Sequence, residues 1–314
     1  MDKLVSAPTK VLNVLSPTGS AKSVESMSSE PDAPKEYRNL LMDMSDGKSD
    51  HIMWINCLKS YDWYGEGNFS FNMDKFGVPV LKNGDYKLNL SIECVDRYVD
   101  DSETDHNGKH LIYWEGNYWT PTEDDCIIVP VQTQALLVNK AANVLKTLGV
   151  GSGDTVLVIS PFIIQIPIIL MATIRIGAVF SLFNATNKSD SDLSEAILLA
   201  NSKVVITADC FWYGGSVINV KRNVDAAMEI VKEKTEVLPQ IVVIQHGAPN
   251  PGLPPIPEEN RVIGRRPIYG VEVPFDPENE FRWSDLMLAA EENCIPKLMD
   301  TEDLMIKNIR KRND

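Results

Sequence analysis

The sequence predicts an α/β protein with a mostly parallel sheet and helices on both of its faces. Three observations lead to this prediction. Several segments of ten or more residues have apolar positions at helical spacing. Between them lie short, largely β-branched apolar runs, which are typical of buried parallel strands. The two kinds of segment alternate along the chain, and this order predicts right-handed crossovers.

The predicted order begins before residue 150. Ile92–Val99 is apolar-periodic and predicts a short helix. Leu111–Asn117 predicts a strand that ends at a turn signal. The apolar positions from Val131 to Leu148 have helical spacing, and Gly149 is expected to end that helix.

The uncharged run Thr155–Ile174 has the length of a membrane-spanning helix. We favour a buried strand at Val156–Ile159 followed by a loop and a helix, because Pro161 and Pro167 interrupt the run. Pro167 suits the first turn of a helix. No aromatic or basic belt flanks the run, so no membrane span is expected and membrane association is the less favoured alternative.

The second half of the chain continues the alternation. Three more strands are predicted, at Ala178–Phe183, Lys203–Thr207 and Gln240–Ile244. Two helices separate them, Asp192–Asn201, with Ser189 or Ser191 as its N-cap, and Val224–Glu236. Residues 247–277 contain eight prolines and predict a loop or linker. Phe281–Ala290 predicts a last helix.

Composition excludes several classes of protein. The formal net charge of −14 argues against a protein that binds nucleic acid or an anionic membrane surface. Five scattered cysteines without a CxxC pair indicate reduced thiols and a cytoplasmic protein. Four histidines leave little material for a metal site, and none is assigned. Residues 16–50 are rich in Ser, Pro and acidic residues and predict a mobile tail.

The residues alone assign no catalytic group. The motifs GxxxxGK[ST], GxGxxG, GxSxG and HExxH do not occur. Gly214-Gly215 is an anion-binding nest or, as we favour, a turn. Asp209 follows a strand and either contacts a ligand or, as we favour, caps the next helix. Cys210 is expected to be a small buried hydrophobe and not a nucleophile.

Eight collinear segments resemble those of AMP-forming acetyl-CoA synthetases, in the adenylate-forming superfamily. They are KLNLSIECVDRYVDD, LIYWEGN, KAANVLKTLGVGSGDTVLVISP, IRIGAVFS, SKVVITAD, VKRNVDAAM, FRWSDL and MDTEDL, between Lys87 and Leu304. The resemblance implies the N-terminal lobe of the adenylate-forming fold. It implies an acidic Ser-Pro tail at 1–50, an N-terminal extension at 51–115, an α/β lobe of the AMP-binding domain at 116–303 and a basic tail at 304–314.

The resemblance implies the reaction of ATP, acetate and CoA, with Mg²⁺, to acetyl-CoA, AMP and pyrophosphate. In the family a phosphate-binding loop follows soon after the position of Glu302, whereas this sequence continues into Lys307 and a Lys/Arg run. The chain as given is therefore expected to be truncated before this loop, to hold no catalytic residue and to be inactive alone. The alternative is a catalytically silent truncated paralogue that acts as a binding or regulatory protein.

The resemblance also locates a CoA-contact segment. The family's Arg-x-Gly-Arg falls on Tyr213, Gly214, Gly215 and Ser216, so both arginines that would meet CoA phosphates are absent. The family's glycine-rich FGGFS falls on residues 185–189, where the glycines are lost. Weak CoA binding is expected. An exposed apolar face on the lobe is also expected to favour self-association.

Overall fold

The computed structural model describes residues 61, 63–65, 70–73, 79–82, 85–99, 110–119, 124–186, 189–213, 216–247 and 273–309. The predicted tail at 16–50 and most of the proline-rich stretch at 247–277 lie outside these residues. The chain divides into two compact units, one of residues 1–62 and 68–84 and the other of residues 63–67 and 85–314. In the first unit, β1 (Ser70–Met73) pairs antiparallel with β2 (Pro79–Lys82).

The second unit is built on a parallel sheet. Its strands, in the spatial order β12-β11-β8-β6-β7, are Glu280–Arg282, Gln240–Ile244, Val204–Ala208, Thr155–Ser160 and Val179–Asn184. Every pair of neighbours is parallel. The predicted α/β class is confirmed.

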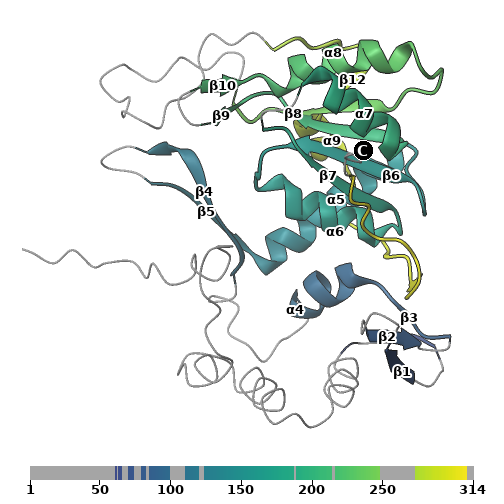
Figure 1. Cartoon of the computed structure of the whole chain (residues 1–314). Coiled ribbons are helices and arrows are strands. Elements are labelled where there is room, and N and C mark those ends of the chain that lie inside the picture. The colour runs from purple at the N-terminus through teal and green to yellow at the C-terminus, as the bar shows by residue number, and fades with distance from the viewer. Residues whose placement is uncertain are drawn as a thin grey trace, which may run out of the picture. The chain divides into compact units, whose positions relative to one another are not determined.

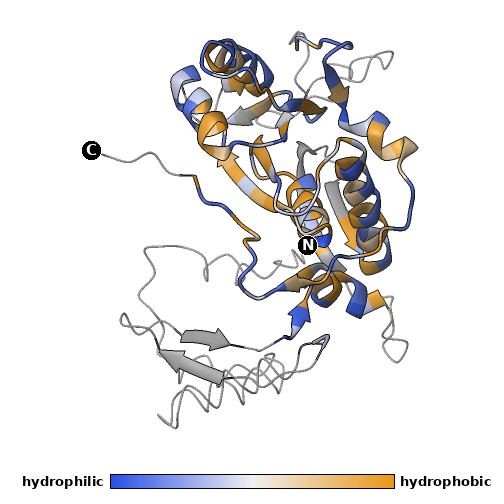
Figure 2. Ribbon diagram, turned by 90° about the vertical axis from the view of Figure 1, so that its right-hand side faces the viewer, coloured by the Kyte–Doolittle hydropathy of each residue, from blue (hydrophilic) through white to orange (hydrophobic). Residues whose placement is uncertain are grey.

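Helices cover both faces of this sheet (Figure 1). They are α5 (Val131–Thr147), α6 (Gln165–Arg175), α7 (Asp190–Ala200), α8 (Val220–Lys232) and α9 (Trp283–Ala289). Because side chains alternate along a strand, Val156 and Val158 of β6 pack in one core with residues of α5 and α6. Leu157 and Ile159 pack in a second core with residues of α7 and α8. Figure 2 shows the apolar residues concentrated on the strands and the inner sides of the helices.

The uncharged run Thr155–Ile174 forms β6, a loop and most of α6, as predicted, with Pro167 in the first turn of the helix. In the described ranges no helix combines the length and apolar character needed to cross a bilayer.

Capping residues determine where several of the other helices begin or end. Ser189 is the N-cap of α7, and its side chain and that of Asp192 form a reciprocal capping box. Gly149 has φ +78°, the left-handed conformation expected after α5. The helix predicted from Val224 begins earlier, at Val220, because the side chain of Asn219 accepts the backbone N–H of Arg222.

Among its described residues, the second unit also has three antiparallel strand pairs and two short helical segments. β3 (Lys87–Leu88) pairs with β13 (Met299–Asp300), β4 (His110–Trp119) with β5 (Asp124–Pro130), and β9 (Phe211–Tyr213) with β10 (Ser216–Ile218). The predicted helix at Ile92–Val99 is a short π-helix, η2 (Ile92–Asp96), followed by α4 (Arg97–Val99).

Two motif residues hold the segment after β3 against the end of α6. The buried side-chain amide of Asn89 donates to the carbonyls of Ile174, Arg175 and Lys297 at 3.0, 3.2 and 2.7 Å. The buried Arg175 guanidinium bonds the carboxylate of Asp96 at 2.8 Å. The resemblance at KLNLSIECVDR therefore falls on residues that hold the fold together.

Candidate functional site

The candidate site lies where β8 ends. β7 lies on one side of β6 and β8 on the other, so the strand order reverses between β6 and β8. In open parallel sheets, ligands bind outside the carboxyl ends of the strands at such a reversal. Asp209 and the β9–β10 hairpin follow β8 at this edge.

Asp209 organises the backbone around this edge. Its side chain is buried, and Oδ1 accepts the backbone N–H groups of Cys210, His246 and Gly247 at 2.6, 2.9 and 2.9 Å. The N-cap of α8 is Asn219, and the backbone carbonyl of Asp209 accepts the N–H of Lys221 in the first turn at 3.0 Å. The prediction that Asp209 caps the next helix therefore holds for its backbone carbonyl and not for its side chain. The side chain instead joins the start of the hairpin to the turn after β11, because one oxygen accepts donors from both segments.

The hairpin brings two of the predicted CoA-contact positions together. Tyr213 and Ser216 are directly opposite each other in β9 and β10, so their side chains leave the same face of the hairpin. Both residues are exposed. Gly214 and Gly215 lie outside the described residues. The two positions could therefore contact one ligand, but neither side chain carries a positive charge.

The thiol next to the hairpin is unreactive. Burial raises the pKa of Cys210 to about 12, and the nearby charge of Asp209 acts in the same direction. The thiolate, which is the nucleophilic form, is then scarce at neutral pH. This agrees with the expectation that Cys210 is a packing residue.

The second predicted contact segment follows β7. The side chain of Asn184 accepts the backbone N–H of Thr186 at 2.9 Å, and Ser189 caps α7. Residues 187 and 188 lie outside the described part. The side chains of Asn184 and Ser189 are thus engaged in local hydrogen bonds, which is typical of a structural loop.

The first turn of α8 carries a cation that no sequence motif singled out. Arg222 is exposed, three residues after Asn219. Its neighbour Lys221 is buried and bonds Asp225 at 2.6 Å and Glu280 at 2.7 Å. Burial raises the pKa of Asp225, and the Glu280 charge raises it further, while Lys221 opposes the shift. Lys221 therefore serves the fold, and Arg222 is the cation here that solvent reaches.

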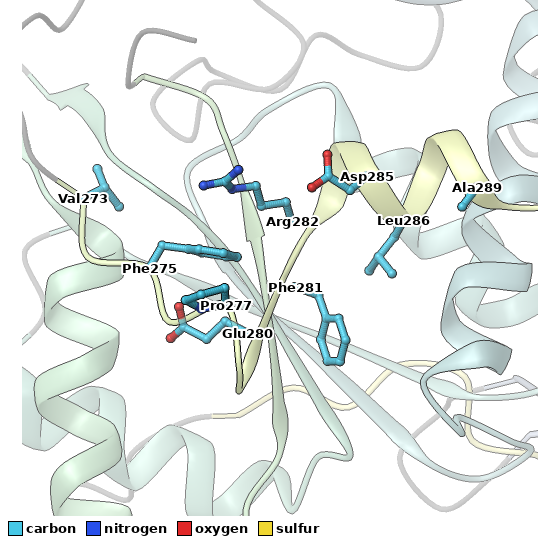
Figure 3. A pocket seen from close by; sticks show the side chains of 9 residues that line it. All are labelled: Val273, Phe275, Pro277, Glu280, Phe281, Arg282, Asp285, Leu286 and Ala289. Carbon is cyan, nitrogen blue, oxygen red and sulfur yellow. The ribbon is translucent and has the colours of Figure 1, made fainter. Parts of the chain in front are cut away.

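A hollow of about 620 Å³ lies beside β12 (Figure 3). Its lining is Val273, Phe275, Pro277, Glu280, Phe281, Arg282, Asp285, Leu286 and Ala289. The Arg282 guanidinium lies 4.5 Å from the centre of the Phe275 ring, a cation–π contact. This lining includes no Ser, Cys, His or Lys, and its ionisable side chains are Glu280, Arg282 and Asp285.

The described residues do not fit the groups that the resemblance implies. Among them no three His, Cys, Asp or Glu side chains are grouped as a metal site. The described hairpin residues carry no cation for a CoA phosphate. We therefore derive no reaction step through ATP, Mg²⁺ or CoA from this geometry.

Sequence comparison gives the family of this region. Residues 134–281 match the family described as AMP-binding enzyme. This range runs from the first turn of α5 into β12 and contains the hairpin.

Known relatives extend the match beyond this range. The chain is 28% identical over 276 residues to acetyl-coenzyme A synthetase of Drosophila melanogaster, which covers 86% of this chain and 38% of that protein. It is 30% identical over 256 residues to the Rubrobacter xylanophilus enzyme of the same name, covering 80% and 34%. The chain thus spans about a third of the length of these relatives. The solved structure of Brucella canis acyl-CoA synthetase aligns with a TM-score of 0.47 and 15% identity, covering 72% of this chain and 32% of that one.

Proposed function

Because the chain belongs to the AMP-binding enzyme family, as a distant relative of the acetyl-CoA synthetases, we propose that it is the substrate-side lobe of an acetate–CoA ligase. The reaction would join acetate to CoA with ATP and Mg²⁺ and release AMP and pyrophosphate. The scattered thiols are consistent with action in the cytoplasm.

The observation that carries this proposal is the hairpin at the carboxyl edge of the sheet. It lies inside the family match, it is fixed by the buried Asp209, and it presents Tyr213 and Ser216 side by side. A ligand held there would lie at the reversal of strand order, where α/β sheets bind their ligands.

The second candidate is a catalytically silent paralogue that binds a partner or regulates. The residues at the two arginine positions favour it, because Tyr213 and Ser216 cannot neutralise a phosphate as guanidinium groups do. If the chain is such a paralogue, the lobe keeps the family fold but lacks the two positive charges that would bind the CoA phosphates. We propose further that the 314-residue polypeptide does not adenylate acetate by itself.

Acetate-dependent exchange of pyrophosphate into ATP tests whether the 314-residue chain adenylates acetate by itself. The 314-residue chain is assayed with ATP and Mg²⁺, with and without acetate, beside an acetyl-CoA synthetase as positive control. We expect no exchange above the acetate-free background. Exchange that requires acetate would refute the inactivity of the chain and support ligase chemistry over the silent paralogue.

Binding of CoA is tested separately by calorimetry. Millimolar or weaker affinity is expected, because the hairpin lacks the two guanidinium groups. Micromolar binding with the present Tyr213 and Ser216 would show that other residues supply the charge, and Arg222 would be the first to replace.

A further inference from the structure

A second hollow, of about 650 Å³, lies along α8, and we name it the α8 hollow. The start of β11 and the segment 274–280 form its other sides. It shares Phe275 and Glu280 with the hollow beside β12 (Figure 3). The helix residues in its lining have the spacing i, i+4, i+7, i+8 and i+11, which places them on one helix face: Lys221, Asp225, Met228, Glu229 and Lys232.

The α8 hollow has apolar walls that belong to the folded core. Met228 and Ile241 are buried in the core beneath α7 and α8, and Phe275 packs against it. Leu238, Pro239 and Pro274 add further apolar surface. A hollow of roughly 300–1,000 Å³ with apolar walls and a few convergent polar groups is typical of sites for small organic molecules.

The charged groups of the lining favour a cation over an anion. Both ammonium groups are already paired, because Lys221 bonds Asp225 and Glu280, and Lys232 lies 2.6 Å from a carboxylate oxygen of Glu229. Asp276 also lines the hollow, so carboxylates outnumber ammonium groups by four to two. A ligand that carries a positive charge would reduce this excess of negative charge.

Asp225 is the carboxylate with room for a second cation. Both oxygens of Glu280 are engaged, Oε1 by Lys221 and Oε2 by the backbone N–H of Asp276 at 3.0 Å. Among the described residues, only Oδ1 of Asp225 accepts a hydrogen bond, from Lys221. The side chain of Asp225 is 34% exposed, against 11% for Glu280. A ligand that enters from solvent can therefore reach Oδ2 of Asp225.

The surroundings of Asp225 also give a reason for such a ligand to bind. Burial raises the pKa of this carboxyl group, which means that its charged form is poorly stabilised in the folded chain. A second cation beside the carboxylate would stabilise the charged form.

We propose that the α8 hollow binds a small organic amine, with the ammonium group at Asp225 and an aromatic or aliphatic body against the apolar walls. This site is independent of the proposed ligase chemistry, because its lining contains no residue of the hairpin. The lining includes Gln240 at the amino end of β11, whereas the hairpin follows the carboxyl end of the parallel strand β8.

Calorimetry of the full chain with tryptamine and 2-phenylethylamine tests the class of ligand. Each amine is compared with its alcohol, tryptophol or 2-phenylethanol, which has the same aromatic body and no charge. We expect each amine to bind roughly tenfold or more tightly than its alcohol, because a charge-assisted hydrogen bond to Asp225 is lost. No binding of either amine at up to about 10 mM, or equal binding of the alcohols, overturns the proposal.

A pair of charge variants tests the role of Asp225. Asp225→Asn keeps the shape of the side chain and should weaken amine binding roughly tenfold, while binding of the alcohols stays within about twofold. Glu233→Gln is the matched control, because it removes one negative charge at the end of the same helix and outside the lining. An equal loss in both variants, or no loss in Asp225→Asn, overturns the proposal.

A pair of tryptophan variants tests the location without changing any charge. Leu238→Trp places a larger side chain in the lining and should weaken amine binding roughly tenfold. Val237→Trp is the control, because Val237 is the preceding residue, is 81% exposed and lies outside the lining. Its amine affinity should stay within about twofold of the unmodified chain. Circular dichroism and the melting temperature verify that both variants fold, and undiminished binding by folded Leu238→Trp overturns the location.

Discussion

Lys221 Nζ lies 2.7 Å from Glu280 Oε1, and this buried ion pair joins α8 to β12. The same ammonium group lies 2.6 Å from Asp225 Oδ1, one turn along the helix. β12 has three residues, which pair in parallel with β11 at the edge of the sheet. The stability of this edge should therefore depend on Lys221.

Lys221→Met should lower the free energy of unfolding by about 3–5 kcal/mol, because two carboxylates lose their cation at a buried position. Urea unfolding followed by circular dichroism measures the loss. Lys232→Met is the matched control on the same helix, since Lys232 Nζ lies 2.6 Å from Glu229 in an exposed pair and should matter little. If both substitutions lowered the free energy of unfolding equally, burial of the Lys221 ion pairs would not be the reason for the loss.

The Asn89 amide gives a second stability prediction. Asn89→Asp keeps the size of the side chain but replaces the donor by a carboxylate that faces three carbonyl oxygens. We expect a loss of about 3 kcal/mol or more. Asn143→Asp is the control, because the Asn143 amide donates to the carbonyls of Glu291 and Asn293 at an exposed position. Its loss should be clearly smaller, and a larger loss for Asn143→Asp would refute the argument.

The buried strands could be predicted from the sequence. Elements whose position depends on pairing with residues far away in the chain could not. Thr155–Ile174 could be resolved into strand, loop and helix because its prolines and β-branched residues act locally. β12 was missed and merged with α9, because Glu280-Phe281-Arg282 has no strand pattern and owes its place to parallel pairing with β11. Residues 304–309, which were predicted as part of a basic tail, have the same explanation. Met305 and Lys307 form backbone hydrogen bonds with Phe180, and backbone bonds of this kind cannot be predicted from the local sequence.

The candidate site was predictable only in part. Tyr213 and Ser216 could be located by resemblance, and the structure places them opposite each other. The three hydrogen bonds to Asp209 could not be anticipated, because two of the donors follow β11, more than thirty residues along the chain. Arg222 lies three residues after the cap residue Asn219, and this position in the sequence does not distinguish it from an ordinary charged surface residue.

Asp154 predicts a defined dependence of stability on pH. The backbone N–H of Gly151 lowers the pKa of Asp154 below its ordinary value of 3.8, and Lys203 lowers it further. The ionised carboxylate therefore stabilises the fold above the ordinary pKa, and this contribution is lost as the pH falls through the lower pKa of the folded state. The melting temperature of Asp154→Asn should lie below that of the unmodified chain at pH 6, and the gap should close by pH 2–3.

Asp225 should behave with the opposite sign. Its pKa is raised, chiefly by burial, so the ionised form is less favourable in the folded chain than in the unfolded one. As the pH rises through 4 and above, Asp225→Asn should gain stability relative to the unmodified chain. If the stability difference between variant and unmodified chain changed with pH in the same direction for Asp154→Asn and Asp225→Asn, the surroundings of the two carboxylates would not differ as described.

The hairpin predicts that CoA affinity can be raised by two substitutions. Tyr213→Arg with Ser216→Arg places two guanidinium groups on the same face, because these residues are directly opposite each other. Two guanidinium groups that meet phosphate oxygens should tighten CoA binding tenfold or more at low salt, and the gain should shrink with added salt. Calorimetry with CoA measures this. Thr147→Arg, at the last residue of α5, with Val237→Arg, in the loop before β11, adds the same charge at exposed positions, and this variant should bind CoA no better than the unmodified chain. Equal gains in the two double variants would mean that net charge alone attracts CoA, and the hairpin would then not be its contact site.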